Sequence, residues 1–177
     1  LKVPSSSSIY GPVYWAVDRG LVKGFDDGTF RPEDSCTREQ FVVMIWRLAD
    51  KPASEADVDF TDMDSSRSTY RAVQWAVGEG IIKGFSDGTF GSEETVTRQQ
   101  VAIMLWRMAG EPSFTQETDF EDVSGSGTGY KSVQWGAEAG LIKGFADGTF
   151  EPEDECLRQQ IVIFLYRYAA RILGESV

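Results

Sequence analysis

The sequence contains no histidine and only two cysteines among its 177 residues. Without histidine it lacks the side chain that most often transfers protons near neutral pH, which disfavours acid–base catalysis. Two cysteines are too few for a disulfide-built miniprotein. No apolar run reaches the roughly 18 residues that a membrane-spanning helix needs. The N-terminal stretch also lacks the charged and then apolar pattern of a signal peptide.

Basic residues are scarce as well, since 17 Lys and Arg stand against 28 Asp and Glu, giving a net charge of −11. Nucleic-acid binding depends largely on neutralised phosphates, and docking on anionic bilayers depends on basic patches. The charge therefore argues against both partners. The 41% hydrophobic content is that of an ordinary globular chain, long enough to bury a core.

The dominant feature is a threefold internal repeat with a period of sixty residues. Polar, proline-containing stretches at 50–59 and 110–119 separate the copies. We therefore divide the chain at 1–50, 51–112 and 113–177, with the first copy incomplete at its N-terminus. We expect one unbroken register across positions such as Trp15, Trp75 and Trp135; Gly20, Gly80 and Gly140; Lys23, Lys83 and Lys143; Arg38, Arg98 and Arg158; and Arg47, Arg107 and Arg167.

Each copy predicts a helix, a loop and a second helix. In the middle copy, Ser68 or Thr69 can cap a helix over residues 70–80, whose apolar side chains are spaced for one face. Gly80 suits a left-handed helix end. The dipeptide Asp87-Gly88 then predicts a tight turn between two phenylalanines.

The second helix starts with a capping-box pattern, Thr97 with Gln100, which recurs as Thr37 with Gln40. Leu157 replaces the threonine in the third copy, so we expect that helix start to be less stable by about 1 kcal/mol. These second helices are apolar on nearly all sides, which indicates that they lie in an interior. The three copies are therefore expected to share one core.

Two catalytic or metal-binding interpretations are disfavoured. The acidic pairs Glu33-Asp34, Glu93-Glu94 and Glu153-Asp154 could serve a glycosidase. Each pair, however, precedes a helix, where the helix dipole favours acids. The Asp-Gly loops lack the full set of acids of an EF-hand calcium loop. We therefore expect that the chain is not an enzyme and that it binds no metal and no cofactor.

Cys36 and Cys156 occupy one repeat position, where the middle copy has Val96. This position either prefers a small apolar side chain, or the two cysteines form a bridge between the first and third repeats. The sequence leaves both alternatives open.

Ligand binding fits the repeated cations better. Arg38, Arg98 and Arg158 stand at helix starts, where a guanidinium beside free backbone N–H groups makes a carboxylate site. The alternative is pairing with acids of the same loop. The arginines late in the helices suit a structural role at the helix end or in an ion pair. The repeated tryptophans belong to the core or offer faces to sugar rings.

The combined motifs resemble surface-layer homology (SLH) repeats over essentially the whole chain. They are Phe-x-Asp at Phe60–Asp62 and Phe120–Asp122, the Trp-containing helix, G-[IL]-[IV]-K-G-F-x-D-G-T-F, and the Thr-Arg start of the second helix. The resemblance implies an all-α-dominated module of three helix–loop–helix repeats, arranged with pseudo-three-fold symmetry around a central three-helix bundle.

The resemblance also implies function. It predicts an extracellular module, fused to a larger surface protein or enzyme, that binds secondary cell wall polysaccharide non-covalently in grooves between repeats. The expected glycan is anionic and carries pyruvylated N-acetylmannosamine. The predicted glycan-binding residues are Arg38, Arg98, Arg158, Asp62, Asp122, Trp15, Trp75, Trp135, Gly20, Gly80, Gly140, Lys23, Lys83 and Lys143.

The chain departs from the family pattern at several positions. The glutamate of the family's Thr-Arg-Ala-Glu motif is replaced by Gln40, Gln100 and Gln160. Lys2 stands sixty residues before Asp62, so we expect the groove that depends on it to be the least complete. The alternative function is a structural module, whose repeats serve self-assembly or protein contacts within a surface layer.

Overall fold

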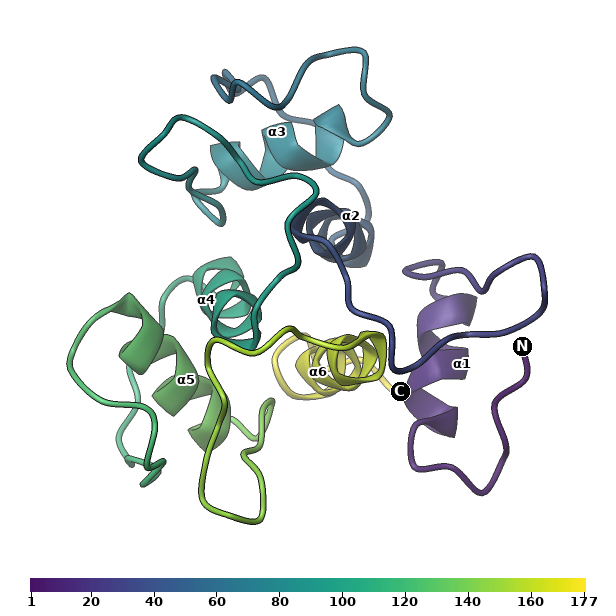
Figure 1. The fold of residues 1–177 in the computed structure, drawn as a ribbon, viewed down its shortest axis with the longest axis vertical. Coiled ribbons are helices and arrows are strands. Elements are labelled where there is room, and N and C mark those ends of the chain that lie inside the picture. The colour runs from purple at the N-terminus through teal and green to yellow at the C-terminus, as the bar shows by residue number, and fades with distance from the viewer.

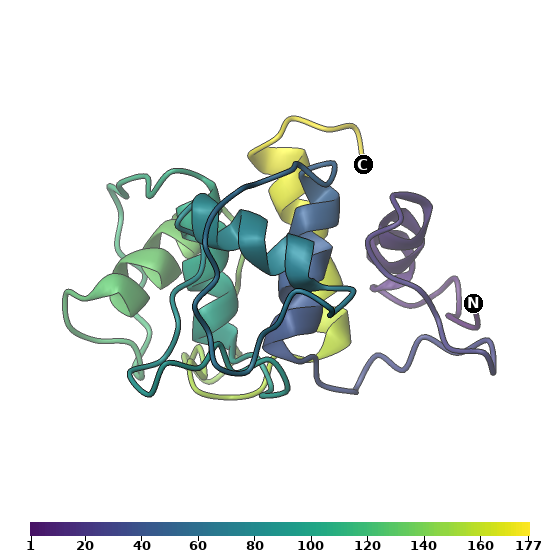
Figure 2. The ribbon, with the colours of Figure 1, turned by 90° about the horizontal axis from the view of Figure 1, so that it is seen from above.

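The computed structural model describes all 177 residues and contains six helices and no strand. A short outer helix precedes a bundle helix in each repeat. The outer helices are α1 (Tyr10–Asp18), α3 (Tyr70–Gly78) and α5 (Thr128–Glu138), and the bundle helices are α2 (Arg38–Leu48), α4 (Arg98–Met108) and α6 (Arg158–Arg171). Figure 1 shows the bundle helices end-on around a central axis, and Figure 2 shows them upright. The predicted three-helix bundle is confirmed.

The bundle helices begin as predicted. The Thr37 hydroxyl accepts the backbone N–H of Gln40 at 3.2 Å, and the Gln40 side chain accepts the N–H of Thr37 at 3.1 Å. The same box opens α4. At α6 the side chain of Leu157 has no acceptor, and only the bond from its N–H to Gln160 remains, at 3.0 Å.

The predicted cap of the outer helix is wrong, although its end is as expected. Neither Ser68 nor Thr69 caps α3, because the Thr69 hydroxyl bonds Glu39 of the preceding repeat instead. Gly80 has a φ of +67° and donates its N–H to the carbonyl of Val77 at 2.9 Å, which ends the helix. No helix is both long and apolar enough to cross a bilayer.

Each outer helix packs on the bundle helix of the preceding repeat. Thus α3 packs on α2, α5 packs on α4, and α1 packs on α6, which closes the ring between the two ends of the chain. At this closure Trp15 meets Tyr166 edge-on at 5.5 Å, and Arg19 forms an ion pair with Glu175 at 3.1 Å. The packing units therefore combine segments from neighbouring sequence repeats.

The segments before the bundle helices bridge one another around the axis. The N–H of Val96 donates to the carbonyl of Cys36 at 2.9 Å, and the N–H of Cys156 donates to that of Val96 at 2.8 Å. The N–H of Arg158 closes the circle on the carbonyl of Asp34 at 2.8 Å. Both cysteines are free and fully buried, and burial raises the pKa of the Cys156 thiol to about 12. The repeat position of Cys36, Val96 and Cys156 is therefore filled by small apolar side chains and holds no disulfide bridge.

The Asp-Gly turns are held by their own aspartates. The Asp87 carboxylate accepts the Thr89 hydroxyl at 2.7 Å and the Thr89 N–H at 2.9 Å. These bonds, that from the hydroxyl above all, hold the pKa of Asp87 below its usual value. Asp27 and Asp147 repeat the arrangement, and the pKa of Asp27 is lowered to about 2. The carboxylates therefore serve the turn itself.

The expected unbroken register is wrong near the N-terminus. The N–H of Lys2 donates to Gly28 just as that of Thr61 donates to Gly88. Lys2 thus corresponds to Thr61. Pro4, however, corresponds to Asp64, because its carbonyl accepts the N–H of Ser7 just as that of Asp64 accepts the N–H of Arg67. One residue is therefore missing between Lys2 and Pro4. Val3 is buried as Met63 is, so the first repeat has no counterpart of Asp62.

Asp62 fixes the loop that leads into α4. Its carboxylate accepts the backbone N–H groups of Phe90, Gly91 and Ser92 at 2.7, 2.9 and 2.9 Å. Burial alone would raise the pKa of this carboxyl, but the bonds from Ser92 and Phe90 bring it below its usual value. Asp122 binds two N–H groups in the same way, whereas the first repeat has no carboxylate at this position.

We expect Asp62→Asn to destabilise the fold by about 1–3 kcal/mol, because it weakens charge-assisted bonds to three buried donors. Since the folded-state pKa is depressed, this stabilisation is present above about pH 4 and is lost as pH falls through the folded pKa. Urea unfolding at pH 7 and pH 3 measures both effects. The exposed Asp57→Asn is the control, and an equal loss in both variants would contradict the assigned role.

Leu157→Thr should stabilise the protein by about 1 kcal/mol, because it restores the acceptor missing from the α6 capping box. The reverse change, Thr97→Leu in α4, should destabilise by a similar amount. Guanidinium unfolding followed by circular dichroism measures the pair. Unchanged midpoints in both variants would show that the boxes contribute nothing.

Candidate functional site

Three buried arginines join each repeat to the next. Arg38, Arg98 and Arg158 are only 4%, 2% and 9% exposed. Their Nε groups donate to the carbonyls of Phe90, Phe150 and Phe30 at 2.9, 2.7 and 3.0 Å, in each case across a repeat boundary. The backbone N–H groups at these helix starts are also occupied, since that of Arg38 donates to Glu94 at 2.8 Å. The expectation of free N–H groups is therefore wrong.

Aromatic rings lie against these guanidiniums, and nearby acids form no ion pair with them. The guanidinium carbon of Arg38 lies 4.6 Å from the ring centre of Phe85 and 5.1 Å from that of Phe90. That of Arg98 lies 4.7 Å from the ring centre of Phe145 and 4.6 Å from that of Phe150. None of the three arginines forms an ion pair. Burial lowers the pKa of Arg38 and Arg98. The alternative of pairing with acids of the same loop is thus also wrong.

The arginines keep unused donors toward the surface. Neither Nη group of Arg38 has a hydrogen-bond partner, yet Arg107 Nε is the only fully enclosed side-chain donor without one. The unused Nη groups are therefore not sealed in. Nη2 of Arg158 donates to the carbonyl of Lys23 at 3.3 Å, and Nη2 of Arg98 donates to that of Lys143 at 3.2 Å. The structure brings these predicted arginines and lysines together.

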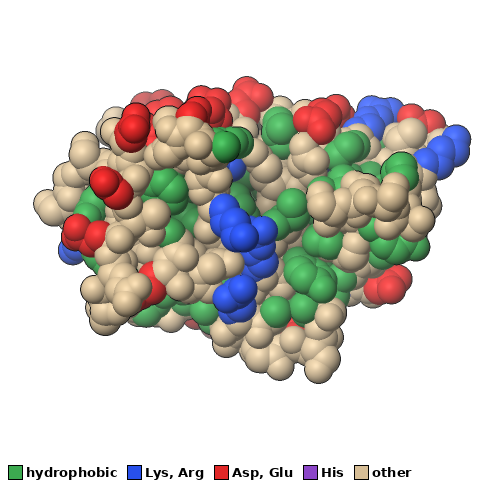
Figure 3. Space-filling view, turned by 90° about the horizontal axis from the view of Figure 1, so that it is seen from below, with side chains coloured by type: hydrophobic (Ala, Val, Ile, Leu, Met, Phe, Trp, Pro, Cys, Tyr) green, Lys and Arg blue, Asp and Glu red, His purple; other side chains and the backbone are tan.

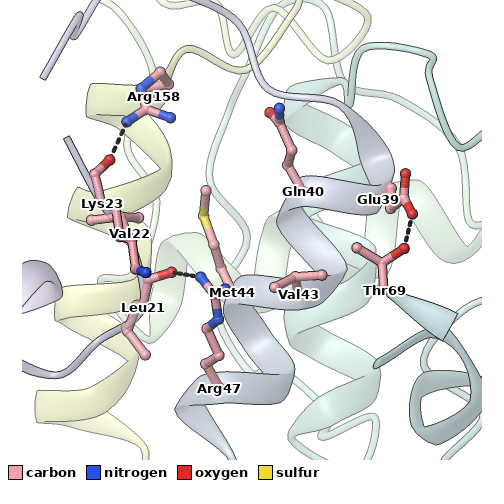
Figure 4. A pocket seen from close by; sticks show the side chains of 10 residues that line it. All are labelled: Leu21, Val22, Lys23, Glu39, Gln40, Val43, Met44, Arg47, Thr69 and Arg158. Atoms are coloured by element: carbon pink, nitrogen blue, oxygen red, sulfur yellow. Dashed lines mark hydrogen bonds between the residues drawn. The ribbon is translucent and has the colours of Figure 1, made fainter. Parts of the chain in front are cut away.

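A cavity of about 250 Å³ opens where Arg158 meets the first repeat. Figure 4 shows Arg158 and Lys23 on one side and α2 on the other. The cavity lies at the repeat where we expected the least complete groove. It is lined by Leu21, Val22, Lys23, Glu39, Gln40, Val43, Met44, Arg47, Thr69 and Arg158.

The charge of this cavity is positive. Lys23, Arg47 and Arg158 line it without forming an ion pair with any acid. Its single acid, Glu39, is already neutralised by Arg67, whose Nη2 lies 2.6 Å from the Glu39 carboxylate. In a chain with a net charge of −11, such an uncompensated cluster of cations is suited to an anion.

The late arginines of the bundle helices have a structural role, as expected, and Arg47 and Arg107 lie in the last turn of their helices. Nη1 of Arg47, Arg107 and Arg167 donates to the carbonyls of Leu21, Ile81 and Leu141 at 2.9, 3.2 and 3.2 Å. They form no ion pair, so the ion-pair alternative is wrong. Sequence reasoning missed the place of Arg47 in the cavity, although its sixty-residue recurrence matched that of Lys23.

The other predicted residues lie mainly in the scaffold. Trp75 and Trp135 are 5% and 6% exposed, while Trp15 is half-buried against Tyr166. Trp75 and Trp135 therefore have little free face for a sugar ring. Gly20, Gly80 and Gly140 end the outer helices with positive φ, and Asp62 and Asp122 bind the loop backbone. Lys83 is exposed but is not bonded to Arg38.

Arg98 faces different surroundings on its other side. A second cavity, of about 540 Å³, combines Arg98 and Phe145 with four acids, Glu151, Glu153, Asp154 and Glu155. Repulsion among carboxylates disfavours an anion on this side of the arginine. The cationic face is the one toward Lys143.

Comparison with known proteins agrees with the architecture. A family model described as "S-layer homology domain" matches residues 3–42, 59–102 and 119–162. Cell surface glycoprotein 1 of Acetivibrio thermocellus is 25% identical over 97% of this chain and 8% of its own length. An endoglucanase of a Bacillus species is 33% identical over 81% and 16%. The Cellulosome-anchoring protein of A. thermocellus is 26% identical over 85% and 36%.

These matches cover well over half of this chain but only a small part of each relative. The similarity therefore concerns one module of larger proteins. Because a segment of the family model falls in each helix–loop–helix repeat, the chain belongs to the S-layer homology domain family, with three tandem repeats.

Proposed function

We propose that this module anchors a larger protein by binding an anionic secondary cell wall polysaccharide in the grooves between its repeats. The observation that carries the proposal is the cavity in which Lys23, Arg47 and Arg158 meet without an acidic partner. A carboxylate, such as the pyruvate ketal of N-acetylmannosamine, fits donors of this kind.

Membership of this family makes the chain an extracellular, cell-wall-associated module. Its relatives include proteins named as surface-layer proteins and one named as cellulosome-anchoring. The endoglucanase aligns over 16% of its length, so the part that it shares with this chain is one module of a larger enzyme. We infer that the cargo lies in other parts of a longer chain.

The three cations of this groove differ in how firmly they are held. Arg158 and Arg47 are fixed by backbone carbonyls, so they present donors that lose little entropy on binding. Lys23 is exposed and unpaired, and it can reach a ligand from the rim. The apolar side chains of Val43 and Met44 offer a surface to a sugar ring.

Repetition of the groove supplies valency. A charge-assisted hydrogen bond to an anion contributes about 1.5–3 kcal/mol. One polymer engaging two or three grooves would gain a factor of roughly 10²–10⁴ over a single site. Firm anchoring therefore does not require one tight site.

Lys23→Gln should weaken binding of purified, peptidoglycan-linked polysaccharide about tenfold, because it removes an anion donor without disturbing a side-chain bond of the fold. Isothermal titration calorimetry measures the change. Lys131→Gln removes the same charge from an exposed position on α5 and should bind like the wild type. Arg158→Ala is a poorer test, since Arg158 also holds two repeats together.

The same titration with depyruvylated polysaccharide tests the anion itself. Binding should fall sharply in the wild type and should no longer respond to Lys23→Gln. Equal affinity for both polymers would remove the carboxylate from the mechanism. Loss of all glycan binding together with concentration-dependent assembly would favour a self-assembly module.

A further inference from the structure

The surface beside α6 carries one cation more than the cavity lined by Lys23, Arg47 and Arg158. Four basic residues gather along the segment 140–143. Nη2 of Arg98 bonds the carbonyl of Lys143, and Nη1 of Arg167 bonds that of Leu141. Arg171 lies over Gly140, where an added methyl group would meet its Nη1 at 2.7 Å. The corresponding Gly20 and Gly80 have open space at this point.

The sequence explains why only the third repeat has this fourth cation. Helices α2 and α4 stop before Asp50 and Gly110, both of which have positive φ. In α6 the two good helix formers Ala169 and Ala170 follow instead, and the helix runs to Arg171. Arg171 therefore stands one turn beyond Arg167, on the same face of the helix.

The charges of these cations are compensated only in part, by acids near Arg98 such as Glu151 and Asp154. Arg98, Lys143, Arg167 and Arg171 form no ion pair. The pKa of Arg167 is lowered by burial and further by the nearby charge of Arg171. Arg107, at the equivalent position of the second repeat, has Glu111 nearby to offset its burial. Like charges held this close favour the binding of an anion between them.

The surface agrees with this assignment. Viewed from below Figure 1, the molecule presents α6 between the α5 and α1 lobes. On that face Figure 3 shows Lys and Arg side chains in one file along the middle, while acids gather mainly along the upper edge. None of Arg98, Lys143, Arg167 and Arg171 lines the cavity of Figure 4.

We propose that the cation cluster along Gly140–Lys143 is the strongest anion subsite of the module, and that Arg171 is an anion-binding residue particular to the third repeat. The inference rests on the proposed function and identifies the groove that contributes most to it, the leading groove. Its ligand is an anionic group on a wall glycan, a carboxylate or a phosphate.

Arg171 could also stabilise the fold without binding a ligand, because a cation suits the C-terminal end of α5. Two variants separate these roles. Arg171→Lys keeps the charge, and Arg171→Gln removes it. Thermal unfolding of both variants reports any loss of stability. Binding that follows charge while melting stays constant supports a ligand role, and binding that only follows melting overturns it.

The decisive experiment titrates pyruvylated, peptidoglycan-linked polysaccharide into the wild type, Arg171→Gln, Lys131→Gln and Lys23→Gln. We expect Arg171→Gln to lower affinity about tenfold at low salt and less at high salt, as a screened charge contact requires. Lys131→Gln should change it less than twofold. Glu111→Gln should raise affinity, since it frees the equivalent cation of the second groove.

The outcomes separate this inference from the proposed function. If Arg171→Gln behaves like Lys131→Gln while Lys23→Gln weakens binding, the leading groove is wrong and the function stands. If the wild type binds no wall polymer, both fail. A parallel titration with a phosphate-bearing wall polymer identifies the anion, because Arg171-dependent binding of either polymer supports the subsite and dependence on neither overturns it.

Discussion

The fold depends on a buried arginine that enters the next repeat and is held there by a carbonyl and two aromatic rings. Arg98 shows the arrangement: its Nε binds the carbonyl of Phe150, and the rings of Phe145 and Phe150 lie against its guanidinium. A buried cation without an acidic partner is costly, so these neighbours must be in place for the chain to fold. Each repeat therefore requires the next one, and α1 on α6 completes the circle.

The same contacts create the grooves. Because each arginine crosses a boundary, its Nη donors emerge where two repeats meet. Those of Arg98 and Arg158 lie at the loop lysine of the following repeat, Lys143 and Lys23. A repeated scaffold then differs from groove to groove through a few side chains, such as Glu39 with Arg67 in one and Arg171 in another. The arginines that hold the repeats together thus leave Nη donors accessible at the boundaries of an acidic protein. Local substitutions then set how strongly each groove attracts an anion.

Local features of this fold could be predicted from the sequence, whereas contacts between repeats could not. Thr97 with Gln100 predicted a helix start because capping is decided within four residues. The partners of Arg98 lie more than forty residues away, and periodicity does not tell which repeat is adjacent. The missing residue beside Val3 was not detected because it lies so near the N-terminus that no repeated residue precedes it. Arg171 did not stand out because Lys51 and Glu111 occupy its position in the other two copies.

Equilibrium unfolding of the wild type and Arg98→Lys tests most directly whether the buried arginines make one cooperative unit. Lysine keeps the charge but loses the planar, forked donor that stacks between the rings. We predict that wild-type unfolding followed by far-UV circular dichroism and by tryptophan fluorescence gives one coincident transition, and that Arg98→Lys is less stable by about 2 kcal/mol or more. Separate transitions in the wild type, or an unchanged midpoint in Arg98→Lys, would contradict the account.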